Sequence, residues 1–191
     1  MAWRRHSGAG RAAGALVATG PPTAAKPAAP MDALLLGASG TATAMMEITG
    51  RAAHAGAVPD RGRNALIELS HQLLQTRDVA KSIPGTQLNW TTANAGTVRN
   101  QIPEKGSAIG DVRVTVVDGL EKLQAALDEK IKTHLVPDTD VKVTIERGRP
   151  PFVATERGRA LAKDGQAIYA ELDRPLAVVD MTGGATDAGY A

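Results

Sequence analysis

The chain has 191 residues, of which 43% are hydrophobic, 22% are charged and only 3% are aromatic, and its net charge is +2. This length allows one or two domains, and the composition is typical of a globular protein whose core is built from Ala, Val, Ile and Leu. The near-neutral charge, without a basic stripe interleaved with aromatic residues, excludes a dedicated nucleic-acid binder, and the lack of cysteine excludes disulfides and thiolate metal sites.

Residues 1–40 differ in composition from the rest of the chain. They are rich in Ala, Gly, Pro and Arg, and four prolines between residues 21 and 30 interrupt any helix. We therefore expect most of this segment to be a disordered leader or linker. Arg4-Arg5 before a short apolar stretch resembles a signal peptide, but Gly14 interrupts that stretch. The sequence leaves the compartment open.

Residues 41–149 carry the hydrophobic periodicity of a single α+β domain. Strand-like segments are at 43–49, 88–98, 107–117 and 140–146, and helix-like segments are at 64–77 and 118–135. The leucines of both helix-like segments are expected to face the core, and Asp118 with Glu121 resembles a capping box at the start of the second. The order β-α-β-β-α-β predicts a ferredoxin-like sandwich, in which two helices cover one face of a four-stranded antiparallel sheet.

Residues 150–191 follow a hinge signal, Pro150-Pro151, and have a different pattern. Residues 156–172 are periodic as a helix, residues 176–179 as a buried strand, and residues 182–191 begin with a glycine-rich turn. This alternation is typical of a partial α/β segment that belongs to a second domain.

Five short motifs occur in one order along the chain. They are Ile48–Gly56 (ITGRAAHAG), Gly96–Pro103 (GTVRNQIP), Asp111–Arg113 (DVR), Arg147–Pro150 (RGRP) and Thr182–Asp187 (TGGATD). One motif alone is a weak signal, but their joint order and spacing is a strong one. From about residue 34 to its end, the chain resembles the zinc-dependent metallopeptidase family of glutamate carboxypeptidase (glucarpidase), succinyl-diaminopimelate desuccinylase, aminoacylase and peptidase T.

The resemblance implies an architecture and a reaction. Enzymes of this family have a catalytic domain with two zinc ions and an inserted lid domain that pairs with the lid of a second subunit. Residues 41–149 are then the lid or dimerisation domain of a homodimer, and residues 150–191 are a fragment of the catalytic domain. The family reaction is hydrolysis of C-terminal glutamate bonds or of N-acyl amino acid amide bonds.

The resemblance also assigns candidate site residues. The histidine matching His54 reaches into the partner's active site and stabilises the oxyanion of the reacting carbonyl group. Asn100 matches a substrate-contacting asparagine, and Arg113 matches an arginine near the substrate carboxylate. Each residue also has an interpretation without a functional role. His54 is then an exposed loop residue, Asn100 is present because it suits the geometry of a turn, and Arg113 forms a salt bridge to Asp111 or Glu146.

The glycine-rich motif near the end of the chain completes the candidate set. In the family this loop lines the active site, and glycines permit a close approach of the backbone to a ligand. The substrate-binding candidates here are Gly183, Gly184 and Thr186. Arg147 and Arg149 are further candidates for binding an acidic tail of the substrate. It is an equally good interpretation that both are simply exposed to solvent at the end of a strand.

The sequence does not contain the metal ligands that the resemblance requires. The family binds zinc through His, Asp and Glu residues, whereas the four histidines of this chain, His6, His54, His71 and His134, have no metal-ligand spacing. No zinc is therefore expected to bind this chain, which alone is expected to be inactive. A natural truncation and an incomplete gene record are both consistent with this pattern.

Two questions stay open at this stage. Either Thr43–Thr49 or Leu88–Val98 is a candidate for the sheet edge at which two lids join. The alternative to an enzyme component is a stand-alone ferredoxin-like module for dimerisation or small-molecule binding, which has no use for a strand at residues 176–179 without a sheet to receive it.

Overall fold

The computed structural model describes residues 16–19 and 32–190. The chain divides into two compact units: unit 1 contains residues 1–40 and 149–191, and unit 2 contains residues 41–148. Unit 2 spans nearly the same residues as the lid domain expected from the sequence, 41–149.

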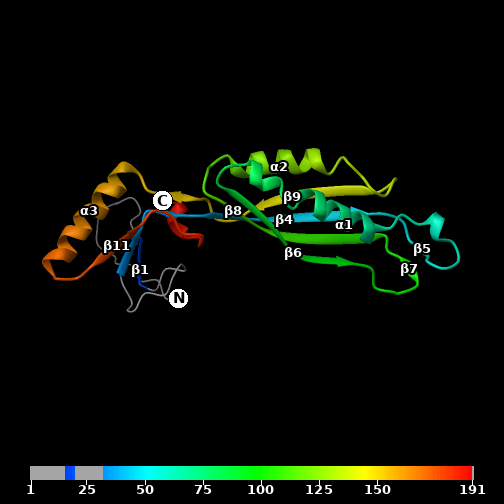
Figure 1. The fold of residues 1–191 in the computed structure, drawn as a ribbon, viewed down its shortest axis with the longest axis horizontal. Helices are drawn as coiled ribbons and strands as arrows, with labels where there is room; N and C mark the ends of the chain where they lie inside the picture. Colours follow the sequence, from blue (N-terminus) through cyan, green and yellow to red (C-terminus); the bar gives the residue numbers. More distant parts are fainter. Residues whose placement is uncertain (1–15, 20–31, 191) are drawn as a thin grey trace. The chain divides into compact units, whose positions relative to one another are not determined.

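Unit 2 is a four-stranded sheet with two helices on one face (Figure 1). Its main elements, in chain order, are β4 (Gly40–Thr49), α1 (Ala65–Thr76), β6 (Thr86–Ala95), β8 (Lys105–Val114), α2 (Gly119–Lys130) and β9 (Asp140–Arg147). The strand order across the sheet is β6-β8-β4-β9, and β6 with β8 and β4 with β9 are antiparallel. The predicted β-α-β-β-α-β sandwich is therefore confirmed.

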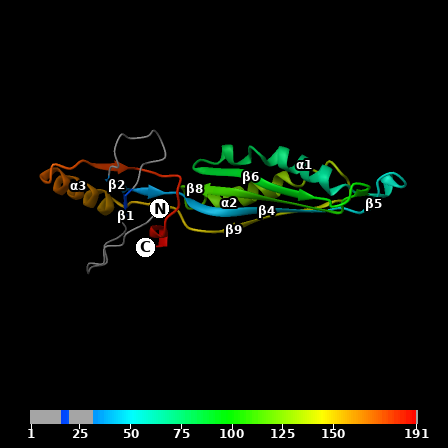
Figure 2. The ribbon, with the colours of Figure 1, turned by 90° about the horizontal axis from the view of Figure 1, so that it is seen from below.

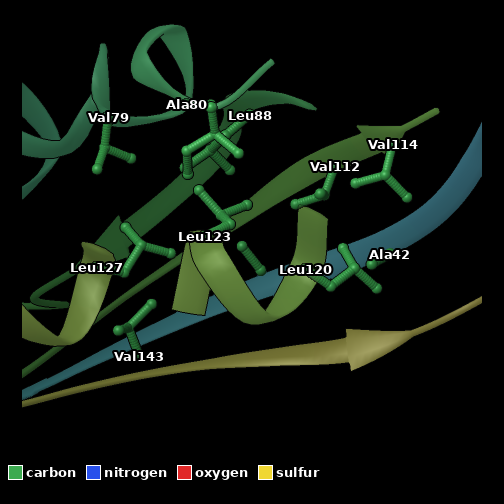
Figure 3. Packing of buried hydrophobic residues seen from close by; sticks show 12 residues of the cluster. Ala42, Val79, Ala80, Leu88, Val112, Val114, Leu120, Leu123, Leu127 and Val143 are labelled. Atoms are coloured by element: carbon green, nitrogen blue, oxygen red, sulfur yellow. The ribbon is translucent and has the colours of Figure 1, made fainter. Parts of the chain in front are cut away.

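The core of unit 2 lies between the sheet and the helices. Leu123 and Leu127 of α2 are fully buried, and they point toward the sheet strands together with Leu120 (Figure 3). Val112 and Val114 of β8 belong to the same buried cluster. Burial of a side chain of this size contributes about 1.5–3 kcal/mol to folding, so α2 is a main source of stability. The prediction that its leucines form the core is confirmed.

Small residues on β8 allow α1 to approach the sheet closely. A Cβ atom at Gly106 would lie 3.2 Å from the carbonyl oxygen of Ala65 in α1, whereas one at Gly110 would meet the neighbouring strand β6, 2.9 Å from Cδ1 of Leu88. Ala108, between these glycines, is buried, whereas Ile109 is 48% exposed on the opposite face of the sheet. Alternate residues of a strand face opposite sides, so Ile109 lies outside the core between the sheet and the helices.

Helix α1 turns a polar side toward the core. Glu68, Gln72 and Thr76 are fully buried, whereas among the four leucines only Leu69 is. Leu66 and Leu74 are 45% and 65% exposed. The prediction that all leucines of this helix form the core is therefore wrong.

The reason is a hydrogen-bonded cluster around the Glu68 carboxylate. Its Oε2 accepts the backbone N–H groups of Leu135 and Val136 at 2.9 and 2.7 Å, and its Oε1 accepts the side-chain amide of Gln72 at 2.8 Å. A buried carboxylate is tolerated only when such donors surround it. Glu68 thus ties α1 to the segment between α2 and β9.

The two helices begin in different ways. The side chain of Asn64 accepts the N–H groups of Leu66 and Ile67 at the start of α1, as an N-cap residue does. Asp118 precedes α2 but its side chain caps no N–H group; it pairs with Lys122 at 2.6 Å. That hydrogen bond lowers the pKa of Asp118. The predicted capping box at Asp118 is therefore wrong.

Unit 1 has a small sheet covered by one helix. Its elements are β1 (Leu16–Thr19), β2 (Asp32–Leu35), β3 (Gly37–Ala38), β10 (Phe152–Val153), α3 (Glu156–Glu171), β11 (Leu176–Val179) and the 3-10 turn η3 (Asp187–Tyr190). β2 lies between antiparallel β1 and parallel β11, and Ala162 of α3 packs on Leu34 and Leu176. No helix in the described part of the chain is long and apolar enough to span a membrane.

The expected disorder of residues 1–40 differs from the structure in two places. Residues 16–19 form β1, and residues 32–40 contain β2, β3 and the start of β4. β2 is ordered because β11, from the far end of the sequence, pairs with it, and the sequence pattern of residues 1–40 carries no trace of that partner. Residues 1–15 and 20–31 lie outside the described part of the chain.

We expect Glu68→Ala to lower the free energy of unfolding by about 2–5 kcal/mol, because two partly buried backbone N–H groups and the buried Gln72 amide lose their acceptor. Chemical denaturation followed by circular dichroism measures this change. Glu47→Ala is the matched control: Glu47 is exposed on β4, and a change within about 0.5 kcal/mol is expected. Equal effects of the two substitutions would contradict the role of the Glu68 cluster.

Candidate functional site

The segments that carry His54 and Asn100 meet at one end of unit 2. β5 (Ala53–His54) pairs with β7 (Gln101–Ile102), and the N–H of Ala55 donates to the carbonyl oxygen of Asn100 at 2.9 Å. In both views β5 lies beyond the end of the main sheet (Figures 1 and 2). We call the two segments 50–63 and 96–104 the tip. The two sequence motifs are thus brought together in space, although 46 positions separate His54 from Asn100.

The imidazole of His54 is held in one orientation by its own loop. The N–H groups of Gly56 and Ala57 both donate to Nδ1 of His54, at 3.1 and 3.0 Å. A nitrogen that accepts these bonds carries no proton, so the proton of the neutral ring is on Nε2. His54 therefore presents an N–H donor on its exposed side, which is the group that an oxyanion requires.

Asn100 is exposed in the turn that precedes β7. Its backbone carbonyl anchors Ala55, whereas its side-chain amide makes no hydrogen bond to another residue of the described chain. An amide group without an internal partner is available to donate to or accept from a ligand. The turn-geometry interpretation and the ligand interpretation are both consistent with this placement.

Arg113 is not part of the tip. It lies eight positions beyond Lys105 on β8, a separation of about 27 Å at ~3.4 Å per residue. Its Nε and Nη2 donate to the two carboxylate oxygens of Asp111 at 2.8 and 3.1 Å. The salt bridge to Asp111, which was one alternative from the sequence, is present, and Arg113 cannot reach the same ligand group as His54 of the same chain.

The glycine-rich motif lies in unit 1 and follows β11. Thr182 pairs with the backbone around Ala38, and the N–H of Ala188 donates to Oγ1 of Thr186 at 3.2 Å. A Cβ atom at Gly183 would meet no heavy atom within 4 Å, and one at Gly184 would meet only Thr182. The described chain thus leaves open space beside both glycines, and their expected role in substrate binding stays a prediction.

Asp187 anchors the end of this motif. Nε of Arg149 donates to the carboxylate of Asp187 at 2.6 Å, and that bond raises the pKa of Arg149. Arg147 instead pairs with Glu121 of α2, which lowers the pKa of Glu121. Both arginines, proposed from the sequence as partners for an acidic substrate, have carboxylate partners within the chain.

The described residues do not assemble a metal site. No three His, Asp or Glu side chains among residues 16–19 and 32–190 converge as ligands of one ion. His134 lies in the segment after α2 rather than at the helix end, and its Nδ1 is 3.0 Å from Oγ1 of Thr139. His71 is on α1 with a buried Nε2 that has no partner in the described chain. His6 lies outside the described residues.

Sequence reasoning missed a hollow beside the tip. It has a volume of about 440 Å³, and polar side chains of Glu47, Asn94 and Lys105 line it. Nζ of Lys105 donates to Oγ1 of Thr49 at 2.9 Å. The residues come from three strands that are distant in sequence, so no local pattern could have indicated the hollow.

The outer side of α1 and the neighbouring edge of the sheet form an exposed surface. Leu66, Ile67 and Leu74 are 45%, 46% and 65% exposed. β6 is an edge strand of ten residues, and its sequence, TQLNWTTANA, contains neither a charge nor a proline. Proteins usually protect an edge strand with charged residues or proline. β4 lies between β8 and β9, so Thr43–Thr49 is not the edge; the other candidate, Leu88–Val98, largely coincides with β6.

Residues 36–139 match the family described as the peptidase dimerisation domain, and the chain belongs to that family. It is 41% identical over 160 residues to carboxypeptidase G2 of Pseudomonas sp. (strain RS-16), covering 84% of this chain and 39% of that protein.

A second curated relative and a solved structure of similar fold extend the comparison. A protein of Haemophilus influenzae that is homologous to one component of p-aminobenzoyl-glutamate hydrolase is 40% identical over 65 residues, which are 34% of this chain and 15% of that protein. The crystal structure of the aminopeptidase PepT from Bacillus cereus has a TM-score of 0.69 at 19% identity and covers 82% of this chain and 42% of its own. The chain thus spans well under half of each of these relatives.

We expect His54 to be the Nε2-protonated tautomer in solution, because two backbone N–H groups already bind Nδ1. Long-range ¹H–¹⁵N correlation spectra of the imidazole, recorded above the usual titration range of histidine, distinguish the two tautomers. His71 and His134 serve as internal references in the same spectrum. A His54 ring protonated mainly on Nδ1 would be incompatible with this geometry.

Proposed function

We propose that this chain is the pairing component of a zinc-dependent carboxypeptidase or amidohydrolase homodimer, in which each tip contributes His54 and Asn100 to the partner's active site. The observation that carries the proposal is the Nε2–H donor of His54, which its loop fixes and exposes. The substrate class would be peptides with a C-terminal glutamate or N-acyl amino acids, in line with the named activities of the relatives.

The chemistry of His54 suits the hydrolysis of an amide. As water or hydroxide adds to the scissile carbonyl, its oxygen becomes negatively charged, and a pre-oriented N–H donor stabilises that charge. Removing one such donor typically costs about 100- to 1000-fold in kcat. Asn100, joined to the His54 loop through its backbone, is placed to donate a second hydrogen bond or to orient the substrate.

The reason to include zinc in this proposal is the resemblance to a family of zinc enzymes. When bound, it activates the attacking water and polarises the carbonyl group. The described residues of this chain do not fit a zinc ion, because no three potential ligands converge. The role derived for this chain is therefore limited to pairing and to the donors of the tip.

The exposed surface of unit 2 supports pairing through β6 and α1. An edge strand without charge or proline accepts a second copy of itself, which extends the sheet across a two-fold axis. Leu66, Ile67 and Leu74 on the adjacent helix would then be buried. A stable dimer buries roughly 1,200–2,000 Å² in total, which a ten-residue strand and a three-turn helix from each copy can provide.

The strand at residues 176–179, β11, pairs with β2 of the same chain and so does not count against a stand-alone module. The outer side of α3 supplies a different argument. Leu161, Ile168 and Leu172 lie on one side of α3 and its end, and they are 44%, 57% and 62% exposed. A stripe of large apolar side chains at helical spacing usually packs against further protein. A module that functions alone has no reason to keep this stripe.

The pairing proposal is tested with Ile67→Asp combined with Leu74→Asp. Placing a carboxylate in each apolar contact of both copies should weaken dimerisation by about 100-fold or more. Sedimentation velocity over a range of concentrations measures the monomer–dimer equilibrium. Val117→Asp, at a position that is 86% exposed elsewhere in unit 2, is the control and should leave it unchanged. A wild-type chain that stays monomeric at high concentration would refute the pairing.

The lack of a metal-ligand set among the described residues predicts that this chain alone is inactive. The purified 191-residue protein with added zinc should not hydrolyse an N-acyl-glutamate above the buffer rate, because the described residues provide no ligand set. Release of free glutamate, quantified by a coupled assay, is the measurement. Turnover that a chelator abolishes and zinc restores would contradict it, and a background rate that a chelator leaves unaffected would identify a contaminating activity.

A further inference from the structure

We propose that Arg63 is a positioning residue that, through Asp138, fixes the His54 loop to the body of unit 2. The inference rests on the proposed role of His54, because an oxyanion donor requires an accurate position. It concerns how the loop is held, which neither the sequence motifs nor the comparisons address.

The Arg63 side chain connects three acceptor groups. Its Nε and Nη2 donate to Oδ2 of Asp138 at 3.1 and 2.8 Å. Its Nη1 donates to the carbonyl oxygens of Gly62 and Asp60 at 2.8 and 3.3 Å. The Arg63 side chain is 22% exposed and its bond to Gly62 is partly buried, whereas the bonds to Asp138, which is 72% exposed, lie at the surface. A planar guanidinium group can make all of them at once, which a lysine cannot.

Asp138 is itself firmly placed. Its backbone has a positive φ of 56°, which few residues other than glycine, asparagine and aspartate adopt. The preceding residues Leu135 and Val136 are bound by the buried Glu68 carboxylate, and Thr139 donates through Oγ1 to the carbonyl oxygen of Val136 at 2.7 Å. Asp138 therefore connects Arg63 to α1 through the Glu68 cluster.

On its other side, Arg63 supports the strand that leads to His54. The backbones of Arg51 and Arg63 exchange two hydrogen bonds of 3.0 and 2.9 Å. Nε of Arg51 also donates to the carbonyl oxygen of Arg61 at 2.6 Å. A Cβ atom at Gly62 would lie 2.7 Å from Cδ1 of Ile102 and 3.2 Å from Cβ of Ala53. The turn at 60–63 thus packs directly against β5 and β7.

The tip needs this support because it has no hydrophobic core of its own. The apolar clusters of unit 2 contain no residue of segments 50–63 and 96–104. Its order depends on backbone hydrogen bonds and on the Arg63 contacts. Misplacement of a catalytic donor by about 1 Å can reduce a rate by roughly 100-fold, so the same contacts would set the efficiency of His54.

The test uses Arg63→Met and Asp138→Asn in the full 191-residue chain. Asparagine tolerates the positive φ of position 138, so Asp138→Asn removes the charge without adding backbone strain. We expect amide hydrogen exchange at Gly56 and Ala57 to become faster by roughly tenfold or more in Arg63→Met, and by less in Asp138→Asn. In Arg63→Met, the population of the Nε2–H tautomer of His54 should fall toward that of an unconstrained histidine side chain.

Arg147→Met is the matched control, because it breaks the Arg147–Glu121 ion pair in the same unit but away from the tip. It should leave the His54 tautomer and the exchange at Gly56 and Ala57 unchanged. If Arg63→Met fails to fold, Arg63→Lys keeps the charge without the planar fork and should show an intermediate increase in exchange.

Unchanged exchange and tautomer in folded Arg63→Met, or equal changes in Arg147→Met, would overturn the positioning role. The readouts need neither zinc nor a substrate nor a partner. A failure of the positioning role is therefore distinguishable from a failure of the proposed function, which shows itself instead in dimerisation and in catalysis by the intact enzyme.

Discussion

The arrangement of unit 2 depends on the hydrogen bonds that the buried carboxylate of Glu68 accepts. It is fully buried and accepts two backbone N–H groups and one side-chain amide. Since an unsatisfied buried charge would cost several kcal/mol, α1 must turn this side inward. The rotation that satisfies Glu68 places Leu66, Ile67 and Leu74 outside, on the exposed surface that α1 forms with the edge strand β6. Because Glu68 must be hydrogen-bonded inside the unit, apolar side chains of α1 are left on its outer surface.

The same cluster extends toward the tip. Glu68 holds Leu135 and Val136, the chain then reaches Asp138, and Asp138 binds Arg63 under the His54 loop. Packing of side chains stabilises the centre of unit 2, whereas hydrogen bonds to backbone groups stabilise its tip. Asp138 is 72% exposed, so its charge alone contributes little after screening by water. The several hydrogen bonds that the planar guanidinium group of Arg63 makes therefore contribute more to holding the loop than the charge attraction does.

The candidate site residues are distributed over both units of the chain. His54 and Asn100 share the tip, Arg113 lies at the other end of β8, and the glycine-rich motif belongs to unit 1. Along β8, Arg113 is about 27 Å from the end of the strand that adjoins the tip, so a site that uses Arg113 and His54 together needs more than one copy of the chain. Membership of the dimerisation-domain family agrees with this requirement.

The sequence by itself determined the order of the elements, because periods of two and 3.6 residues are local properties. It also identified the family through its motifs, and it placed His54 and Asn100 in them. Only the tertiary structure decided which leucines of α1 are buried and which strand is the edge. Glu68 meets Leu135 67 positions away and Arg63 meets Asp138 75 positions away. Such contacts leave no periodic pattern, because each depends on segments that only the folded sheet brings together.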